Sequence, residues 1–267
     1  MGCAESKNET LLDRLRERFP KTLSILELQQ YSTVLAEKFI AFDKSGDSTL
    51  SYQEFILMCK IPQNRVTMRL FAICDMDGTT SLDFREACYA LWQLCTLDHD
   101  GLKLFLFDLY DEFNNGAIEY DDVERMLSDS YGSSNMSNEE MQDMVSFVKA
   151  EGVLDRRGFE RFCGRCPQVL KQLVDVQKSM REQVLGVRVW SKLEARRSLK
   201  TDPLFRPENW CMLMERIIVM DIESREEQER LLKERELREG RKMKRVHIKM
   251  SAAQKDESAQ HRVRYEP

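Results

Sequence analysis

Oxygen-bearing side chains recur at regular positions in the twelve-residue segment DMDGTTSLDFRE, which runs from Asp75 to Glu86. A calcium loop takes oxygen ligands from positions 1, 3, 5 and 7, and a bidentate glutamate closes it at position 12. In this segment, called loop 2 below, these positions hold the predicted ligands Asp75, Asp77, Thr79, Ser81 and Glu86. Apolar helical runs flank the loop, and Leu82 stands at position 8, where two loops pair through a short strand. The pattern therefore predicts a Ca²⁺ site between two helices.

A second segment with the same spacing lies 32 residues earlier and reads DKSGDSTLSYQE. This segment, loop 1, offers one carboxylate fewer than loop 2, because Ser51 stands at position 9 where loop 2 has Asp83, and Leu50 stands at its position 8. Its predicted ligands are Asp43, Ser45, Asp47, Thr49 and Glu54.

Both loops lack glycine at position 6, where a sharp turn normally requires it. Ser48 and Thr80 stand there, and glycine is displaced to position 4 in each loop. A side chain in a left-handed turn costs about 1–2 kcal/mol, which corresponds to about a tenfold loss of affinity. We therefore expect dissociation constants in or above the sensor range of roughly 10⁻⁷ to 10⁻⁵ M.

A third segment, Asp111 to Asp122, reads DEFNNGAIEYDD and forms loop 3. Phe113 at position 3 gives no oxygen, and the shorter Asp122 replaces glutamate at position 12. Weak ligation by Asp111, Asn115 and Asp122 is compatible with weak Ca²⁺, with Mg²⁺ or with no ion. Further along, residues 137–162 fit a fourth helix-loop-helix unit whose loop is too short for twelve residues, which predicts packing without an ion.

With these loops, the chain resembles EF-hand proteins of the calcineurin B-like and neuronal calcium sensor group over residues 1–165. The loop starts, 32 and then 36 residues apart at Asp43, Asp75 and Asp111, resemble the spacing of calcineurin B. The resemblance implies an all-α fold with two paired EF-hand lobes, at residues 24–92 and 101–165. It also implies a calcium sensor or adaptor whose apolar groove opens on calcium binding to hold an amphipathic helix of a target protein.

The amino terminus, MGCAESK, fits the pattern for N-myristoylation at Gly2, and Cys3 beside it is a candidate second acylation site. Two acyl chains anchor a protein stably, whereas one binds a membrane only marginally. Residues 1–20 are thus predicted to form a lipid anchor and a short amphipathic helix ended by Pro20. We expect attachment to the cytoplasmic face of a membrane. An accidental Met-Gly start is the alternative.

Charge divides the chain into an acidic front and a basic back. Residues 1–160 carry 29 Asp and Glu against 16 Lys and Arg, and residues 161–267 carry 17 against 25. The acidic part suits cation binding, and the basic part suits a lipid surface or an acidic protein face better than nucleic acid. No small-molecule substrate or enzyme signature is evident, and Cys163 with Cys166 lacks the second pair of ligands that a zinc site needs.

The predicted extension, residues 166–250, begins with an apolar helical stripe that breaks near Gly186 and is followed after Pro207 by a long charged helix. Trp210, Leu213, Met214 and Ile217 share one face of that helix. Residues 251–267 form a tail. A competing interpretation therefore remains: a calcium-insensitive scaffold that uses the hands as packing units and the long helix for protein contacts.

Overall fold

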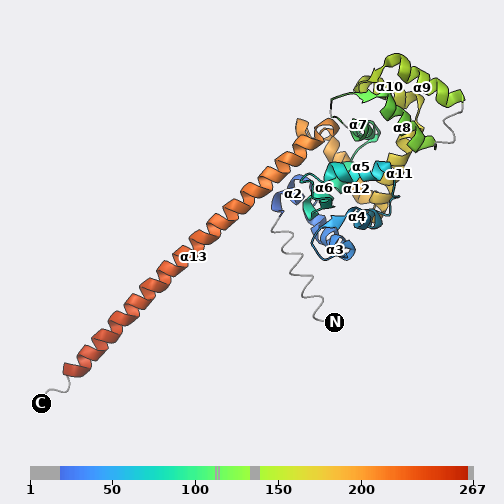
Figure 1. Cartoon of the computed structure of the whole chain (residues 1–267). Coiled ribbons are helices and arrows are strands. Elements are labelled where there is room, and N and C mark those ends of the chain that lie inside the picture. The colour runs from blue at the N-terminus through green and yellow to red at the C-terminus, as the bar shows by residue number, and fades with distance from the viewer. Residues whose placement is uncertain (1–18, 112, 114, 133–138, 264–267) are drawn as a thin grey trace. The chain divides into compact units, whose positions relative to one another are not determined.

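The computed structural model describes residues 19–111, 113, 115–132 and 139–263 (Figure 1). Gly2, Cys3 and the helix expected before Phe19 lie outside the described residues. The helices are α2 (Pro20–Ile25), α3 (Ser32–Phe42), α4 (Tyr52–Cys59), α5 (Arg65–Cys74), α6 (Phe84–Cys95), α7 (His99–Tyr110), α8 (Tyr120–Tyr131), α9 (Glu139–Glu151), α10 (Arg156–Arg165), α11 (Gln168–Gln183), α12 (Val187–Ser198) and α13 (Trp210–Val263). Short 3₁₀ turns span Gln29–Tyr31, Pro203–Phe205 and Pro207–Asn209. The predicted all-α class is confirmed.

Four two-residue strands tie the helices into pairs of hands. β1 (Leu50–Ser51) pairs antiparallel with β2 (Ser81–Leu82), and β3 (Ile118–Glu119) pairs with β4 (Val153–Leu154). The apolar residues at position 8 of loops 1 and 2, Leu50 and Leu82, face each other, and Ile118 at position 8 of loop 3 faces Leu154 of the fourth hand. Each strand lies between two helices, so α3 to α6 form one EF-hand pair and α7 to α10 the other.

The fourth hand keeps this pairing although its loop is short. α9 ends at Glu151 and β4 begins at Val153, so Gly152 alone separates them, with a φ of 80°. The Asp155 carboxylate then caps α10 by accepting a hydrogen bond of 2.6 Å from the backbone N–H of Gly158. The predicted loss of a twelve-residue loop is therefore confirmed, and its packing role is retained.

One helix start expected from the sequence is wrong. Ser24 and Glu27 look like a capping box for the first hand, but Ser24 lies in the last turn of α2 and Glu27 has a φ of 58°. Pro20 begins α2, because a fixed φ suits the first helical position, and the helix predicted before it lies outside the described residues. The first hand begins at Ser32, after the 3₁₀ turn.

The helices after the hands pack into the same core. Gly186, with a φ of 86°, separates α11 from α12, as the stripe predicted. In α11, the side chains of Leu173, Val176 and Met180 are fully buried. α11 packs against α4, α5, α6, α7 and α8, so it covers both pairs of hands and not only the last one.

The chain divides into two compact units, residues 1–218 and 219–267. The first turns of α13 belong to the first unit, where Leu213, Met214 and Ile217 are buried. The Trp210 indole donates a hydrogen bond of 3.0 Å to Asp108, and Tyr89 donates to the Trp210 carbonyl. In the second unit α13 continues to Val263, beyond the end near Lys244 that the sequence suggests. No helix in the described part of the chain combines the length and apolarity needed to cross a bilayer.

Candidate metal centre

Loop 2 brings three of its predicted ligands together. Carboxylate oxygens of Asp75, Asp77 and Glu86 all lie within 4.8 Å of one another. Backbone N–H groups hold the Asp75 carboxylate in place, since Thr79 donates to it at 3.0 Å and Thr80 at 2.8 Å. Within the described ranges, this is the one group of three carboxylate, thiol or imidazole side chains that meets so closely.

Glu86 closes loop 2 from the first turn of α6. Its side chain is fully buried, and it accepts hydrogen bonds of 3.0 Å from the backbone N–H groups of Met76 and Asp83. Asp83 in turn caps α6 by accepting a hydrogen bond from the Glu86 N–H at 2.8 Å. Burial raises the pKa of Glu86 to about 7, and the nearby charges of Asp83 and Asp77 contribute to the rise. The carboxylate therefore lies where an anion is costly without a cation beside it.

This arrangement fits a divalent cation bound through oxygen. Three carboxylates of like charge repel one another, and a buried carboxylate loses hydration, so a hard cation would offset both costs. Thr79 and Ser81 add neutral oxygens, and the Thr79 hydroxyl lies 3.0 Å from the Ser81 carbonyl. Oxygen donors at these positions suit Ca²⁺.

Loop 1 has the same hydrogen bonds but is more open. Glu54 reaches back to the loop start, where it accepts from the Lys44 N–H at 2.7 Å, and the Ser48 N–H donates to Asp43 at 3.0 Å. Asp47, in contrast, is turned toward Thr49, whose hydroxyl donates to it at 2.7 Å. Slight burial raises the pKa of Glu54, but hydrogen bonds from Ser51, Lys44 and Ser45 together outweigh burial and lower it. The two loops thus differ most at position 12, where Glu54 is half-buried and Glu86 is fully buried, and only in loop 2 do three described carboxylates converge.

Both loops adopt a left-handed turn at position 6, where each has a residue with a side chain in place of glycine. Ser48 has a φ of 68° and Thr80 a φ of 65°, in the left-handed region that glycine prefers. The position-4 residues Gly46 and Gly78 also have positive φ values, of 74° and 68°. Each loop therefore contains two left-handed residues, and only one of them is glycine.

Replacing Thr80 by glycine is expected to tighten Ca²⁺ binding about twofold to fivefold. Relief of about 1–2 kcal/mol of strain exceeds the roughly 0.5–1 kcal/mol that glycine loses in entropy, and the Thr80 side chain is exposed to solvent. Gly78→Ala is the matched control, because it adds a side chain at a left-handed position with open space around it, and it should weaken binding. Competition against a calcium-chelating dye measures both, and equal affinities in all three proteins would contradict the strain argument.

Loop 3 keeps its turn, but its ligand at position 12, Asp122, is paired with a basic side chain. Asp111 accepts hydrogen bonds from the N–H groups of Asn115 at 3.0 Å and Gly116 at 2.8 Å. Asp122, however, forms an ion pair of 2.5 Å with Arg125, and among the described residues the backbone hydrogen bond that it accepts, from the Glu119 N–H, is long at 3.4 Å. Phe113, at position 3, is 77% exposed. Loop 3 is therefore a poorer candidate than the other two.

Polar side chains of α11 hold the ends of the helices that leave the loops. The last carbonyls of a helix lack partners within it, and side-chain donors can satisfy them. Gln177 donates to the Leu94 and Leu97 carbonyls, both at 2.8 Å, at and after the end of α6. Arg181 donates in the same way to the Cys95 carbonyl at 2.9 Å. Ser179 is placed to donate to the carbonyls of Cys59 at 3.0 Å and Lys60 at 2.9 Å, and Gln172 donates to the Asp129 carbonyl. α11 thus contacts the carboxyl ends of α4, α6 and α8.

Sequence reasoning missed these donors, because it followed the apolar stripe of α11. Gln172 and Gln177 stand between apolar positions of that stripe. A polar residue inside an apolar face was the available signal, but its partners are more than 40 residues away in sequence and could not be named from it.

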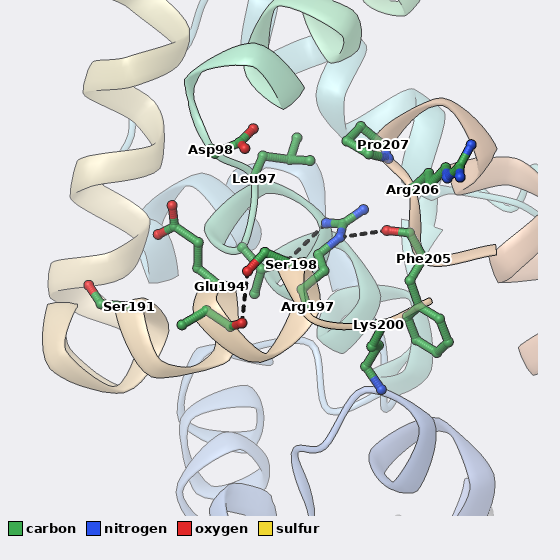
Figure 2. A pocket seen from close by; sticks show the side chains of 12 residues that line it. Leu97, Asp98, Ser191, Glu194, Arg197, Ser198, Lys200, Phe205, Arg206 and Pro207 are labelled. Atoms are coloured by element: carbon green, nitrogen blue, oxygen red, sulfur yellow. Dashed lines mark hydrogen bonds between the residues drawn. The ribbon is translucent and has the colours of Figure 1, made fainter. Parts of the chain in front are cut away.

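A hollow of the first unit lies away from the loops. It has a volume of about 690 Å³ and is bounded by α12, the link between α6 and α7, and residues 205–207 (Figure 2). Arg197 occupies its centre and donates to the Phe205 carbonyl at 2.9 Å. Its acidic and basic lining residues do not form a metal-ligating group.

Comparison with known proteins places the hands in a family. No family model matches the chain. The type 2 calcineurin B of the rat is 32% identical over 145 residues, which cover 51% of this chain and 80% of the relative. The chain belongs to the calcineurin B family. The calcineurin B of Naegleria gruberi is 30% identical over 48% of this chain and 74% of the relative, and the type 1 calcineurin B of Dictyostelium discoideum is 27% identical over 57% and 81%. Membership in this EF-hand family and the oxygen donors of loop 2 assign Ca²⁺ as the ion of this calcineurin B relative.

Proposed function

We propose that this calcineurin B relative is a membrane-tethered calcium sensor or regulatory adaptor and not an enzyme. The convergence of Asp75, Asp77 and Glu86 within 4.8 Å carries the proposal. These residues, with Thr79 and Ser81, would hold Ca²⁺, which supplies the positive charge that lets the three carboxylates stay together. Loop 1 provides a second, more solvated site in the same EF-hand pair.

Glu86 connects the candidate site to a helix that α11 holds at its far end. Glu86 lies in the first turn of α6, and Gln177 and Arg181 bind carbonyls at the carboxyl end of α6 and just after it. A shift of Glu86 that moves α6 must therefore lengthen or bend these hydrogen bonds. In this way a change at loop 2 would weaken the hold on α11.

The target-binding surface follows from this connection. The apolar side of the hands is covered by the chain's own α11. We infer that calcium binding loosens α11 and gives an amphipathic helix of a target protein access to the apolar groove beneath it. The relatives are named as subunits of calcineurin, which suggests another subunit of such an assembly as one kind of target.

The exposure step can be tested with an apolar dye and a disulfide lock. Dye fluorescence of the full chain is expected to rise at saturating calcium, and a cross-link between α11 and α6 should abolish the rise. Pull-down of partners with and without calcium then identifies the target. Dye binding that is unchanged by calcium would favour the competing interpretation, a calcium-insensitive scaffold. The coverage of the apolar side of the hands by α11 is the observation that supports this alternative.

The membrane tether is supported by the amino-terminal sequence alone, because Gly2 and Cys3 lie outside the described residues. Co-expression with an N-myristoyltransferase should add the mass of one myristoyl group to the intact protein. Gly2→Ala should prevent the addition. If the unsubstituted chain keeps its unmodified mass, the proposed tether is contradicted, and so is the proposed location at the cytoplasmic face of a membrane. The proposed calcium site would not be affected by this result.

A further inference from the structure

Exposed cations line the outer face of α12. Arg188 and Lys192 are exposed, and Leu199 on the same side is 80% exposed. Spacings of four and seven residues place these three side chains on one face of a helix. Trp190, Leu193 and Arg197 are buried on the opposite face. The outer face therefore combines unshielded charge with an apolar side chain in water.

The charge of this face is not neutralised by neighbouring acids. Residues 187–200 contain five Lys and Arg and one acid, Glu194. Glu194 is held by Arg181 at 2.8 Å. Arg188 and Lys192 form no ion pair with any described residue, whereas Arg196 and Lys200 contact Glu27 at 3.5 and 2.8 Å. The free positive charge of α12 is therefore concentrated at Arg188 and Lys192.

The hollow on the other side of α12 is a poorer place for an anion. Figure 2 shows Asp98 and Glu194 beside it, and both bring negative charge. Its central cation, Arg197, is already engaged by the Phe205 carbonyl and by the Thr96 hydroxyl at 2.9 Å. In the hollow an anionic partner would thus meet these acids together with the cation Arg206, whereas Arg188 and Lys192 on the outer face form no ion pair with any described residue.

The ion pairs to Glu27 also relate α12 to the amino-terminal end of the described chain. Glu27 follows Phe19, the first described residue, by eight positions. The roughly 17 residues from Gly2 to Phe19 can span at most about 60 Å when extended. A chain acylated at Gly2 has the reach to bring the outer face of α12 to the same membrane.

We propose that Arg188, Lys192 and Leu199, here called the α12 cationic face, form a second contact with the membrane, against anionic lipid headgroups. The proposal rests on the proposed lipid tether and extends it. Basic residues near an anionic leaflet strengthen binding by roughly fivefold each, and one acyl chain alone holds a protein only marginally. The exposed Leu199 is placed to enter the boundary between headgroups and acyl chains.

The test measures binding of the full, acylated protein to vesicles of phosphatidylcholine with and without phosphatidylserine. R188Q/K192Q is expected to weaken binding to phosphatidylserine vesicles about 25-fold and to leave binding to neutral vesicles unchanged. R157Q/K178Q is the matched control, because it removes the same charge from exposed positions on α10 and α11 that form no ion pair with any described residue. Its effect should stay within about twofold. Raised salt should weaken binding of the unsubstituted protein more than that of R188Q/K192Q.

Equal losses in the two double variants would overturn the proposal, since net charge alone would then explain them. Unchanged binding of R188Q/K192Q to phosphatidylserine vesicles would overturn it as well. Gly2→Ala separates the face from the tether. Weak binding of Gly2→Ala that needs phosphatidylserine and is abolished by R188Q/K192Q supports the face even if no acylation occurs, whereas loss of all binding to neutral vesicles on Gly2→Ala reports the tether alone.

Discussion

Replacing Glu86 by glutamine is expected to weaken Ca²⁺ binding at loop 2 by at least about a hundredfold. Glu86 is fully buried beside Asp75 and Asp77, and it is the residue that closes the loop at position 12. Its replacement removes one of three converging negative charges, and EF-hand affinities span several orders of magnitude with ligand charge. Calorimetric titration of the full chain measures the loss directly.

Glu54→Gln is the matched control, because it makes the same change at position 12 of loop 1. The Glu54 carboxylate belongs to no close group of three acids among the described residues, so we expect a smaller loss and a remaining site at loop 2. Glu86→Asp should fall between glutamine and glutamate, because a shorter side chain at position 12 reproduces loop 3. Equal affinity in the Glu86→Gln and unsubstituted chains would show that loop 2 is not the principal site.

Replacing Leu173 by alanine is expected to lower the free energy of unfolding by about 2–5 kcal/mol. The Leu173 side chain is fully buried in the middle of α11, where its removal leaves a cavity among the hands. Urea unfolding of the full chain in the presence of a chelator measures the change. Val174→Ala is the control on the same helix, because Val174 is 39% exposed and its truncation should cost less than about 1 kcal/mol.

The comparison of these two variants tests whether α11 belongs to the core. If Leu173→Ala and Val174→Ala lower stability equally, α11 does not pack on the hands as described. If Leu173→Ala alone destabilises the chain and also increases dye binding, α11 is the cover of the apolar groove. The second result would connect stability with the proposed exposure step.

The EF-hand pairs could be predicted because their determinants are local. Ligand spacing within twelve residues and an apolar residue at position 8 predicted the loops. The pairing of Leu50 with Leu82 could be expected for the same reason, whereas Leu154, the partner of Ile118, lies in a hand without a twelve-residue loop. The left-handed turns at Ser48 and Thr80 also follow from loop spacing, despite side chains that disfavour them.

Contacts between segments that are far apart in the sequence could not be predicted from local sequence patterns. The capping motif at Ser24 and Glu27 failed because Pro20 starts a helix there, so both residues fall at or just after the end of α2. The Trp210 indole meets Asp108, 102 residues earlier, and nothing near either residue names the other. The same holds for Gln177 and the end of α6, which is why the polar hold of α11 emerges only from the folded chain.

The ligand geometry of loop 2 distinguishes residues that share one sequence pattern. Asp75, Asp77 and Glu86 meet, whereas Asp47 turns to Thr49 and Asp122 pairs with Arg125. Sequence spacing ranked the loops by counting carboxylates. Burial and convergence explain why loop 2 stands first, since Glu86 closes it from a fully buried position whereas Glu54 of loop 1 is half-buried.

Calcium titration of the full, metal-free chain by calorimetry, from nanomolar to millimolar calcium, tests the central claim most directly. We predict saturable binding with a dissociation constant of roughly 10⁻⁷ to 10⁻⁵ M or somewhat weaker, accompanied by a rise in melting temperature. The absence of both heat of binding and a change in melting temperature at millimolar calcium would contradict the proposal of a calcium sensor. The calcium-insensitive scaffold would then be the remaining interpretation.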